Sequence, residues 1–384
     1  MKRKTTCLVL TALVIAGCAS SGPSKEEYQA LQERLNQLER QGQQQQGQQP
    51  APQTAPAQQS QQYTTESHFQ TEAISGGLRI TGYTGPGGDV RIPPTINGQS
   101  VVAIGDSAFS GGSGFALSHP GVGLTNITIP GSVRTIGKWA FAGNKQLTTI
   151  IFSHGVTTIE DYAFDECPLT SITIPNSVTT IARGAFRSSQ LTTITIPDSV
   201  TRLGLDPFGN RIVSVSVGTG FVDNRFSQVF GSCSSLTAIN IAAGNPVYSS
   251  VDGVVYNKTG TTLIYWPKGK TPVNIPSSVT TIGGNDRVFE QKMTSIIIPN
   301  NVTVINGMED KAEGRNVWHI AFSRNDLISI TIGANVTING LAFSTLDRWD
   351  MAISNGFKEA YNNGGKRAGT YTRPSTDSTT WTRQ

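Results

Sequence analysis

The stretch LTTITIPDSVTRLGLDPF at residues 191–208 repeats, with small changes, the stretch LTSITIPNSVTTIARGAF at residues 169–186. Related phrases also begin at residues 293 and 327. Self-similarity at a fixed short period is the signature of a solenoid, in which each copy forms one coil and stacks on the next. The clearest successive copies begin 23, 22, 22, 21 and 24 residues apart, at Leu124, Leu147, Leu169, Leu191, Ile212 and Leu236.

Each copy follows approximately the pattern LxxIxIPxSVxxIxxxAF. In the copy at 191–208, Ile194 and Ile196 alternate with Thr193 and Thr195, which is the period of a strand with one buried face. A proline then ends the strand, and the alanine–phenylalanine pair is expected to fill the coil interior. One coil cannot bury its own faces, so coils must stack and both ends need caps. The pattern predicts a leucine-rich-repeat solenoid of about 22–23 residues per coil, with parallel strands on one face and short irregular or helical return legs.

The repeats resemble the BspA-like, Treponema-type leucine-rich-repeat family over most of residues 76–384. Three further segments resemble features of this family. The N-terminal module of the family is resembled by LRITGYTGPGGDVRIPPTINGQSVVAIGDSAF (78–109), and a β-hairpin that turns at residues 258–260 by VDGVVYNKTGTTLIYWPKGK (251–270). The capping end of spirochaete members is resembled by FKEAYNNGGKRAGTYTR (357–373). The chain departs from the pattern in a degenerate coil after Ile212, an insertion at 110–123 and an excursion at 306–319. The resemblance implies adhesion to host matrix proteins or to other bacteria.

The first residues have the features of a secretion signal. A basic tripeptide at 2–4 precedes an apolar stretch at 7–16, which is about half the length needed to span a bilayer. The stretch ends in Ile-Ala-Gly-Cys at Cys18 and resembles the lipobox of bacterial lipoproteins, where signal peptidase II cleaves before a cysteine that carries a diacylglycerol. The resemblance implies that residues 1–17 are a signal peptide and that Cys18 anchors the mature chain in a membrane through several acyl chains. The alternative is an ordinary secretory leader with a chance cysteine.

A stalk is expected to follow at residues 18–68. Its residues 25–40 carry one apolar stripe, formed by Tyr28, Leu31, Leu35 and Leu38, which predicts a short amphipathic helix, either transient or forming a weak coiled coil. Residues 42–62 are nearly all Gln, Pro, Ala and Gly and form a solvated spacer. The solenoid is placed at 69–345, with a hairpin insertion near 243–270, and the C-terminal cap at 346–384.

Composition excludes several classes of function. The formal charge is +4, and removal of the three basic leader residues leaves about +1, too little for electrostatic nucleic-acid binding. The four histidines have no metal-ligand spacing, and no nucleophile motif or carboxylate pair is present, so we expect no metal, no cofactor, no small-molecule substrate and no enzyme. Cys167 and Cys233 are separated by three coil steps, roughly 14 Å at strand spacing. A disulfide spans at most about 7 Å between Cα atoms, so two free, buried thiols are predicted.

Two surfaces are candidates for binding. The outward strand positions are mostly small and hydroxyl-rich, as at Thr193 and Thr195, and are interpreted as scaffold. Aromatic rings beside cations are common in recognition surfaces, which makes the hairpin region the stronger candidate, although packing of the hairpin against a neighbouring coil is the alternative. The candidate binding surface comprises Tyr248, Tyr256, Lys258, Tyr265, Trp266, Lys268 and Lys270.

These observations lead to one functional prediction and two alternatives. The protein is predicted to be a lipid-anchored bacterial cell-envelope protein, at the outer membrane or cell surface, whose solenoid binds host or bacterial surface proteins. A periplasm-facing structural scaffold is the first alternative. A polysaccharide-acting β-solenoid enzyme is the second, and the uncharged strand face argues against it.

Overall fold

The computed structural model describes residues 62–110, 122–284, 287–312, 315–322, 325–340, 342–343, 345–346, 352–353 and 356–384. The expected signal peptide, Cys18 and the stalk up to residue 61 lie outside the described residues, as does most of the insertion at 110–123. Residues Tyr63–Gln384 form one compact unit. In the described part of the chain, no helix is long and apolar enough to cross a membrane.

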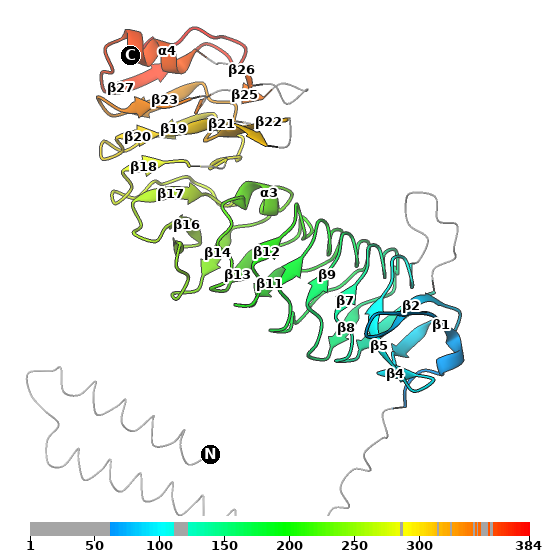
Figure 1. The fold of residues 1–384 in the computed structure, drawn as a ribbon. Helices are drawn as coiled ribbons and strands as arrows, with labels where there is room; N and C mark the ends of the chain where they lie inside the picture. Colours follow the sequence, from blue (N-terminus) through cyan, green and yellow to red (C-terminus); the bar gives the residue numbers. More distant parts are fainter. Residues whose placement is uncertain are drawn as a thin grey trace, which may run out of the picture. The chain divides into compact units, whose positions relative to one another are not determined.

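The solenoid begins with an antiparallel module. After the short η1 (Glu66–His68), β1 (Phe69–Ile74) pairs antiparallel with β2 (Gly77–Tyr83), and β2 pairs parallel with β5 (Gln99–Ile104), which also takes up β4 (Thr95–Ile96). From β5 onward the same sheet continues through parallel strands of the coils, in the order β1-β2-β5-β7-β9-β10-β12. The four added strands are β7 (Thr135–Ile136), β9 (Thr158–Ile159), β10 (Thr180–Ile181) and β12 (Arg202–Leu203). The hairpin β1–β2 therefore covers the first edge of the parallel stack (Figure 1).

Each coil in the first half of the solenoid has three sides. The predicted strand side carries two parallel sheets, β3-β6-β8 and β11-β13-β14. A Thr-Ile pair in three coils and Arg202–Leu203 in the fourth form a second parallel ladder, which the sequence pattern alone did not predict. The third side, the return leg, is built of turns whose backbone groups bond from coil to coil, as from the amide of Phe141 to the carbonyl of Ala163 (2.8 Å). The strands are β3 (Gly88–Arg91), β6 (Leu124–Ile129), β8 (Thr149–Phe152), β11 (Thr193–Ile196), β13 (Ser214–Val217) and β14 (Ala238–Ile241) on the strand side, and β7 (Thr135–Ile136), β9 (Thr158–Ile159), β10 (Thr180–Ile181) and β12 (Arg202–Leu203) on the second side.

The phenylalanine of each coil stacks on its counterparts in a buried column. Ring centroids lie 5.0 Å apart between Phe141 and Phe164 and 5.4 Å apart between Phe164 and Phe186, with nearly parallel planes. In the first four coils of the column an alanine, Ala108, Ala140, Ala163 or Ala185, precedes the phenylalanine and is also buried. The column confirms that the Ala-Phe pair fills the coil interior, and it runs through Phe109, Phe141, Phe164, Phe186, Phe208 and Phe230.

The second half of the solenoid resumes the coils after α3 (Phe226–Phe230) and a three-stranded insertion. The turn expected at residues 258–260 is present between two antiparallel strands, and a further strand precedes them. The excursion at 306–319 forms the antiparallel pair β21 (Gly307–Ala312) and β22 (Arg315–Ile320). The remaining elements are β15 (Tyr248–Val251), β16 (Val254–Asn257), β17 (Thr262–Tyr265), β18 (Thr281–Ile282), β19 (Ser295–Ile297), β20 (Val304–Ile305), β23 (Ser329–Ile332), β24 (Thr337–Ile338), β25 (Thr345–Leu346), β26 (Ala352–Ile353), α4 (Phe357–Asn363), β27 (Gly369–Thr372) and β28 (Thr382–Arg383).

The C-terminal elements close the last coils with aromatic side chains. Tyr361 on α4 is fully buried, and its hydroxyl donates to the carbonyl of Gly333 (2.7 Å) and accepts from the amide of Val336 (3.0 Å). Antiparallel β27 pairs with β23 and then with β28. The parallel sheet therefore ends against antiparallel strands at this end as well.

The buried apolar residues form two clusters, and the hairpin β16–β17 contributes to both. Val255 and Tyr265 belong to the cluster of the first half, whereas Tyr256 and Leu263 belong to the cluster of the second half. Successive side chains along a strand point to opposite faces, which separates Val255 from Tyr256, and a register shift pairs Tyr265 with Val255 and Leu263 with Tyr256. The hairpin is therefore buried on both faces and separates the two cores.

Candidate functional site

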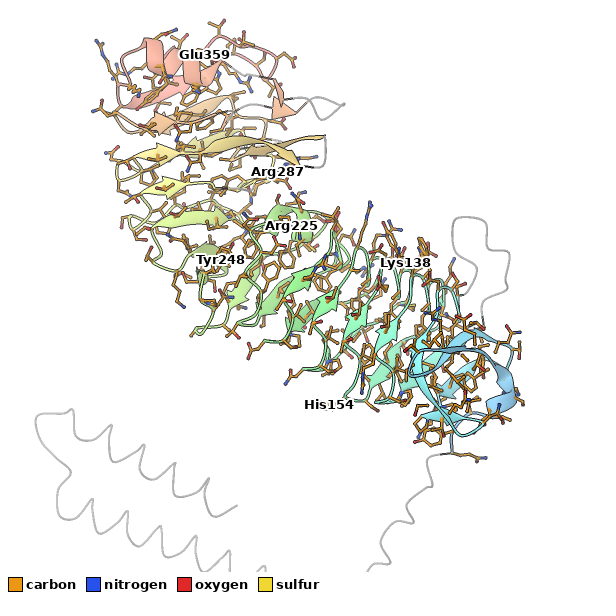
Figure 2. All side chains as sticks on the ribbon, viewed as in Figure 1. Lys138, His154, Arg225, Tyr248, Arg287 and Glu359 are labelled. Atoms are coloured by element: carbon orange, nitrogen blue, oxygen red, sulfur yellow. The ribbon has the colours of Figure 1, made fainter. Side chains whose placement is uncertain are left out.

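The aromatic rings of the predicted binding surface lie inside the protein. Only 2–5% of each of the four residues Tyr248, Tyr256, Tyr265 and Trp266 is exposed. The Tyr248 ring meets Phe226 edge-on at 5.0 Å, in the region where the hairpin follows α3 (Figure 2). Burial raises the pKa of Tyr256 to about 12, with a smaller contribution from the nearby Asp252 carboxylate. The burial favours the alternative of hairpin packing for these rings.

The three lysines of the same cluster bind groups of the protein itself. Carbonyl oxygens and carboxylates of neighbouring segments accept from their ammonium groups, so the lysines hold the hairpin in place. The contacts are Lys258 Nζ with the carbonyl oxygens of Ala243 (2.8 Å) and Asn245 (2.6 Å), Lys268 Nζ with the carbonyl oxygen of Gly231 (3.0 Å) and with Glu290 Oε2 (3.6 Å), and Lys270 Nζ with Asp252 Oδ2 (3.0 Å).

The strand side presents the small polar surface that its sequence indicates. Thr193 and Thr195 on β11 are exposed, whereas Ile194 and Ile196 are buried. Ile151 on β8 interrupts the hydroxyl-rich surface and is 54% exposed. This side therefore offers a flat face without charged groups on its strands between β6 and β14.

The return legs carry an exposed aromatic stack that the sequence pattern did not reveal. The rings of Trp139 and Tyr162 lie 5.8 Å apart with an angle of 4° between their planes, and Trp139 is 38% exposed. The guanidinium carbons of Arg187 and Arg183 lie 5.0 and 5.8 Å from the centre of the Tyr162 ring. We call Trp139, Tyr162, Arg183 and Arg187 the aromatic ladder. In the view of Figure 2 its side of the coils, marked by Lys138, lies opposite the edge marked by His154.

Trp139 and Tyr162 occupy backbone positions that favour glycine. Their φ angles are 52° and 57°, and the equivalent residues of other coils are also left-handed, at Ser107 (56°), Gly184 (59°) and Asp206 (44°). The turn needs this conformation because each amide then donates to the next coil, as Trp139 does to the carbonyl of Asp161 (3.0 Å). A left-handed residue other than glycine costs about 1–2 kcal/mol. The chain therefore holds two large aromatic side chains where glycine would avoid this cost.

Neighbouring residues hold the aromatic ladder in one arrangement. A Cβ atom on Gly184 would lie 2.4 Å from Tyr162 Cε1, so the missing side chain leaves the space that the Tyr162 ring occupies. Arg187 Nη2 donates to Asp165 Oδ2 at 2.7 Å, and Asp165 is buried. This hydrogen bond raises the pKa of Arg187, against a smaller lowering by burial. The guanidinium is therefore fixed beside the Tyr162 ring.

The sequence did contain a signal for these residues. In the four coils that carry an Ala-Phe pair between residues 108 and 186, the residue before the pair is Ser107, Gly184 or a large aromatic, Trp139 or Tyr162. A position that accepts serine and glycine in some coils and aromatic residues in two adjacent ones is not needed for packing of the core.

The described residues contain no group of three or more His, Cys, Asp or Glu side chains that could hold a metal ion. Cys167 and Cys233 are free and buried, as their coil separation predicted. Burial raises the pKa of each thiol to about 12, which leaves both protonated and unreactive at neutral pH. A mixed-charge groove of about 850 Å³ near β2 and β5 is lined by Glu72, Arg79, Asp106, Arg134, Lys138 and Glu160 among others.

Comparison with known proteins identifies the type of repeat. Residues 113–237 match the BspA type leucine rich repeat region in 6 copies. Over these residues the chain carries BspA-type leucine-rich repeats, and its fold is the predicted leucine-rich-repeat solenoid. No curated protein matches the chain.

Several solved bacterial structures are similar. A Treponema pallidum leucine rich repeat protein is 29% identical, with 46% of this chain and 81% of that chain covered and a TM-score of 0.42. A Bacteroides ovatus leucine-rich repeat protein is 22% identical, with 72% and 67% covered and a TM-score of 0.44. The pneumococcal vaccine antigen PcpA is 20% identical, with 71% and 83% covered and a TM-score of 0.42.

Proposed function

We propose that the protein is a bacterial cell-envelope protein, lipid-anchored at Cys18, whose solenoid binds a protein partner through the aromatic ladder. Its role is adhesion to host or bacterial surface proteins, and it is not an enzyme. The observation that carries the proposal is the exposed stack of Trp139 on Tyr162 with Arg187 beside it.

The composition and strain of the aromatic ladder both support recognition. Tryptophan, tyrosine and arginine are the residues most enriched among those that dominate binding energy at protein interfaces. The left-handed φ of Trp139 and Tyr162 stores strain. Strained residues persist only where the surrounding structure compensates for them, and they cluster at functional sites such as ligand-binding sites. The hydrogen bond from Arg187 to Asp165 fixes one member of the aromatic ladder, which lowers the entropy lost on binding.

The experiment uses the chain with its first 17 residues removed and Cys18→Ala, so that it stays in solution. The immobilised protein is exposed to host matrix proteins and to extracts of bacterial surface proteins, and bound proteins are eluted. Trp139→Ser is the test variant, because Ser107 has the same left-handed conformation one coil earlier. Ile151→Ser is the matched control, because Ile151 is also an exposed apolar residue but lies on the strand side. Loss of a partner with Trp139→Ser alone supports the proposal, and equal capture by the two variants contradicts it.

The anchor has its own test. In cells that express the full chain, Cys18→Ala is expected to move the protein from the membrane fraction to the soluble fraction. An unchanged membrane fraction would refute anchoring at Cys18. Digestion by added protease on intact cells places the solenoid outside the cell, whereas full protection favours the periplasmic scaffold.

A further inference from the structure

The hydrogen-bonded ladder on the strand side stops and restarts once in the second half of the solenoid. The sheet β11-β13-β14 ends with β14, and the sheet β19-β23-β27-β28 begins with β19. The segment 271–275 follows β14 by one coil and belongs to neither sheet. Among the described residues β19 pairs only with β23, so its other edge is open.

The open edge presents the backbone groups of Ser295 and Ile297. The amide of Ile298 donates to the carbonyl of Thr331, and the carbonyl of Thr294 accepts from the amide of Ile328, both at 2.8 Å. Residues 294, 296 and 298 therefore direct their backbone groups toward β23. Because successive residues of a strand direct these groups to alternate sides, the amides and carbonyls of Ser295 and Ile297 point to the open edge. Unpaired groups of this kind form a template for another strand.

A groove lies along this edge. Its volume is about 610 Å³, and it is lined by residues 271–275 on one side and by residues 291–297 and Pro299 on the other. Val273, Ile275, Met293 and Ile296 supply buried or half-buried apolar side chains to it, and Ile297 is 70% exposed at its edge. The groove thus combines apolar lining with free backbone donors and acceptors.

One charge marks an end of the groove. Lys292 is exposed and is the single charged residue among those that line it. Within the described residues it makes no ion pair. It precedes the first residue of β19 by three positions, so it lies at the end where β19 begins.

We propose that this groove binds an extended peptide segment of a partner protein, which adds to the open edge of β19 as a parallel strand. Its backbone bonds the free groups of Ser295 and Ile297, and alternate apolar side chains enter the groove. An acidic residue near its N-terminus lies beside Lys292. The direction follows β23, which pairs parallel with the other edge of β19. The site is separate from the aromatic ladder and does not depend on the function proposed for it.

The test measures binding of a synthetic peptide to the chain with Cys18→Ala and its first 17 residues removed. The fluorescein-labelled peptide DLTTITI copies the strand sequence of residues 191–196 with one added acid, and binding is followed by fluorescence anisotropy. KLTTITI tests the charge, and a DLTTITI peptide with N-methyl groups on alternate amides tests the backbone. We expect saturable binding of DLTTITI, weaker binding of KLTTITI and about tenfold or greater loss on N-methylation, because a lost hydrogen bond leaves its partner unpaired.

Two variants of one residue separate backbone from side chain. Ser295→Pro removes an amide that the β19–β23 ladder does not use, and proline is accepted on the open side of an edge strand. Ser295→Ala keeps the amide and is the matched control. We expect about tenfold or greater loss for Ser295→Pro, no loss for Ser295→Ala, and a reversed preference between DLTTITI and KLTTITI for Lys292→Glu.

Several results would overturn the proposal. They are the absence of saturable binding by DLTTITI up to millimolar concentration, equal binding of the N-methylated peptide, or unchanged binding by a folded Ser295→Pro variant. If circular dichroism shows that Ser295→Pro fails to fold, the N-methylated peptide decides the question with the unaltered protein. If the two sites are independent, the Ser295→Pro variant should lose binding of DLTTITI but still capture a partner protein through the aromatic ladder.

Discussion

Replacement of Trp139 by glycine and, separately, by alanine isolates the backbone strain of the aromatic ladder. Both substitutions remove the Trp139 ring and its stack on Tyr162, so they differ only in the free-energy cost of the left-handed backbone conformation. At φ 52° alanine bears the left-handed cost of about 1–2 kcal/mol. Glycine avoids that cost but loses about 0.5–1 kcal/mol through the greater freedom of its unfolded chain. We therefore expect the glycine variant to be more stable than the alanine variant by about 0.75 kcal/mol, the difference between the middle values of these two ranges.

The neighbouring position supplies the control. Lys138 is exposed, and its φ is not positive. There alanine is expected to be the more stable replacement, by about 0.5–1 kcal/mol, since only the entropy difference remains. Glycine should thus give the more stable variant at position 139, and alanine the more stable variant at position 138. Compared with the unaltered protein, the Trp139→Ala variant is expected to have a free energy of unfolding lower by about 0.5–1.5 kcal/mol, because the stack on Tyr162 is lost.

Urea unfolding monitored by circular dichroism measures all four variants under one condition. Free energies of unfolding are compared at a common denaturant slope, because a change in slope would signal an altered unfolded state. An alanine variant at residue 139 that equals or exceeds the glycine variant would refute the strain argument. The same holds if glycine is also the more stable residue at position 138.

Three further predictions concern Gly184 beside the aromatic ladder, the buried phenylalanine column and the two buried cysteines. Gly184→Ala is expected to displace the Tyr162 ring, because the new Cβ would lie 2.4 Å from Tyr162 Cε1, and to destabilise the protein at φ 59°; unchanged tyrosine fluorescence and urea midpoint would contradict this. Phe164→Ala is expected to lower the free energy of unfolding by about 3–5 kcal/mol, and a loss below about 1 kcal/mol would contradict the stacked column. Burial raises the pKa of Cys167 and Cys233 from 9.0 to about 12, so above pH 9 the unfolded chain binds fewer protons than the folded chain. The free energy of unfolding should therefore fall by about 1.4 kcal/mol per pH unit per thiol between pH 9 and pH 12. The variant with both cysteines replaced by serine should lack this pH-dependent fall.

The repeat pattern predicts the coil and its register well because each residue contacts its own counterpart in the next copy. Thr193 pairs with Ser214 and Ile194 with Val215, at the separation that the sequence period gives. Interior positions follow from the alternation of apolar and polar residues. The separation of Cys167 from Cys233 follows from the same period, which is why two free thiols could be predicted.

The candidate site was less predictable, for physical reasons. An aromatic residue beside a lysine has the same composition in a hairpin core as on a surface, and Tyr265 and Trp266 proved to be buried. The consecutive apolar residues Val254 and Val255 were a sign that both faces of that hairpin are covered. The left-handed backbone at Trp139 left no sign in the residue type, because tryptophan rarely adopts it. The open edge of β19 depends on hydrogen bonds between distant coils, which a local pattern does not encode.

The hairpin between the two hydrophobic clusters has a mechanical consequence. The proposed anchor and the proposed partner would place the chain under tension between two surfaces. Each repeat contacts only its neighbours, so the terminal coils, which have one neighbour each, are expected to unravel first. Loss of a coil on one side of β16–β17 removes neighbours from one cluster but leaves the other cluster packed against its own face of the hairpin. Unfolding that begins at either end of the solenoid is therefore expected to stop at the hairpin β16–β17 before it continues. A force–extension record of the solenoid should then contain two separate unfolding steps.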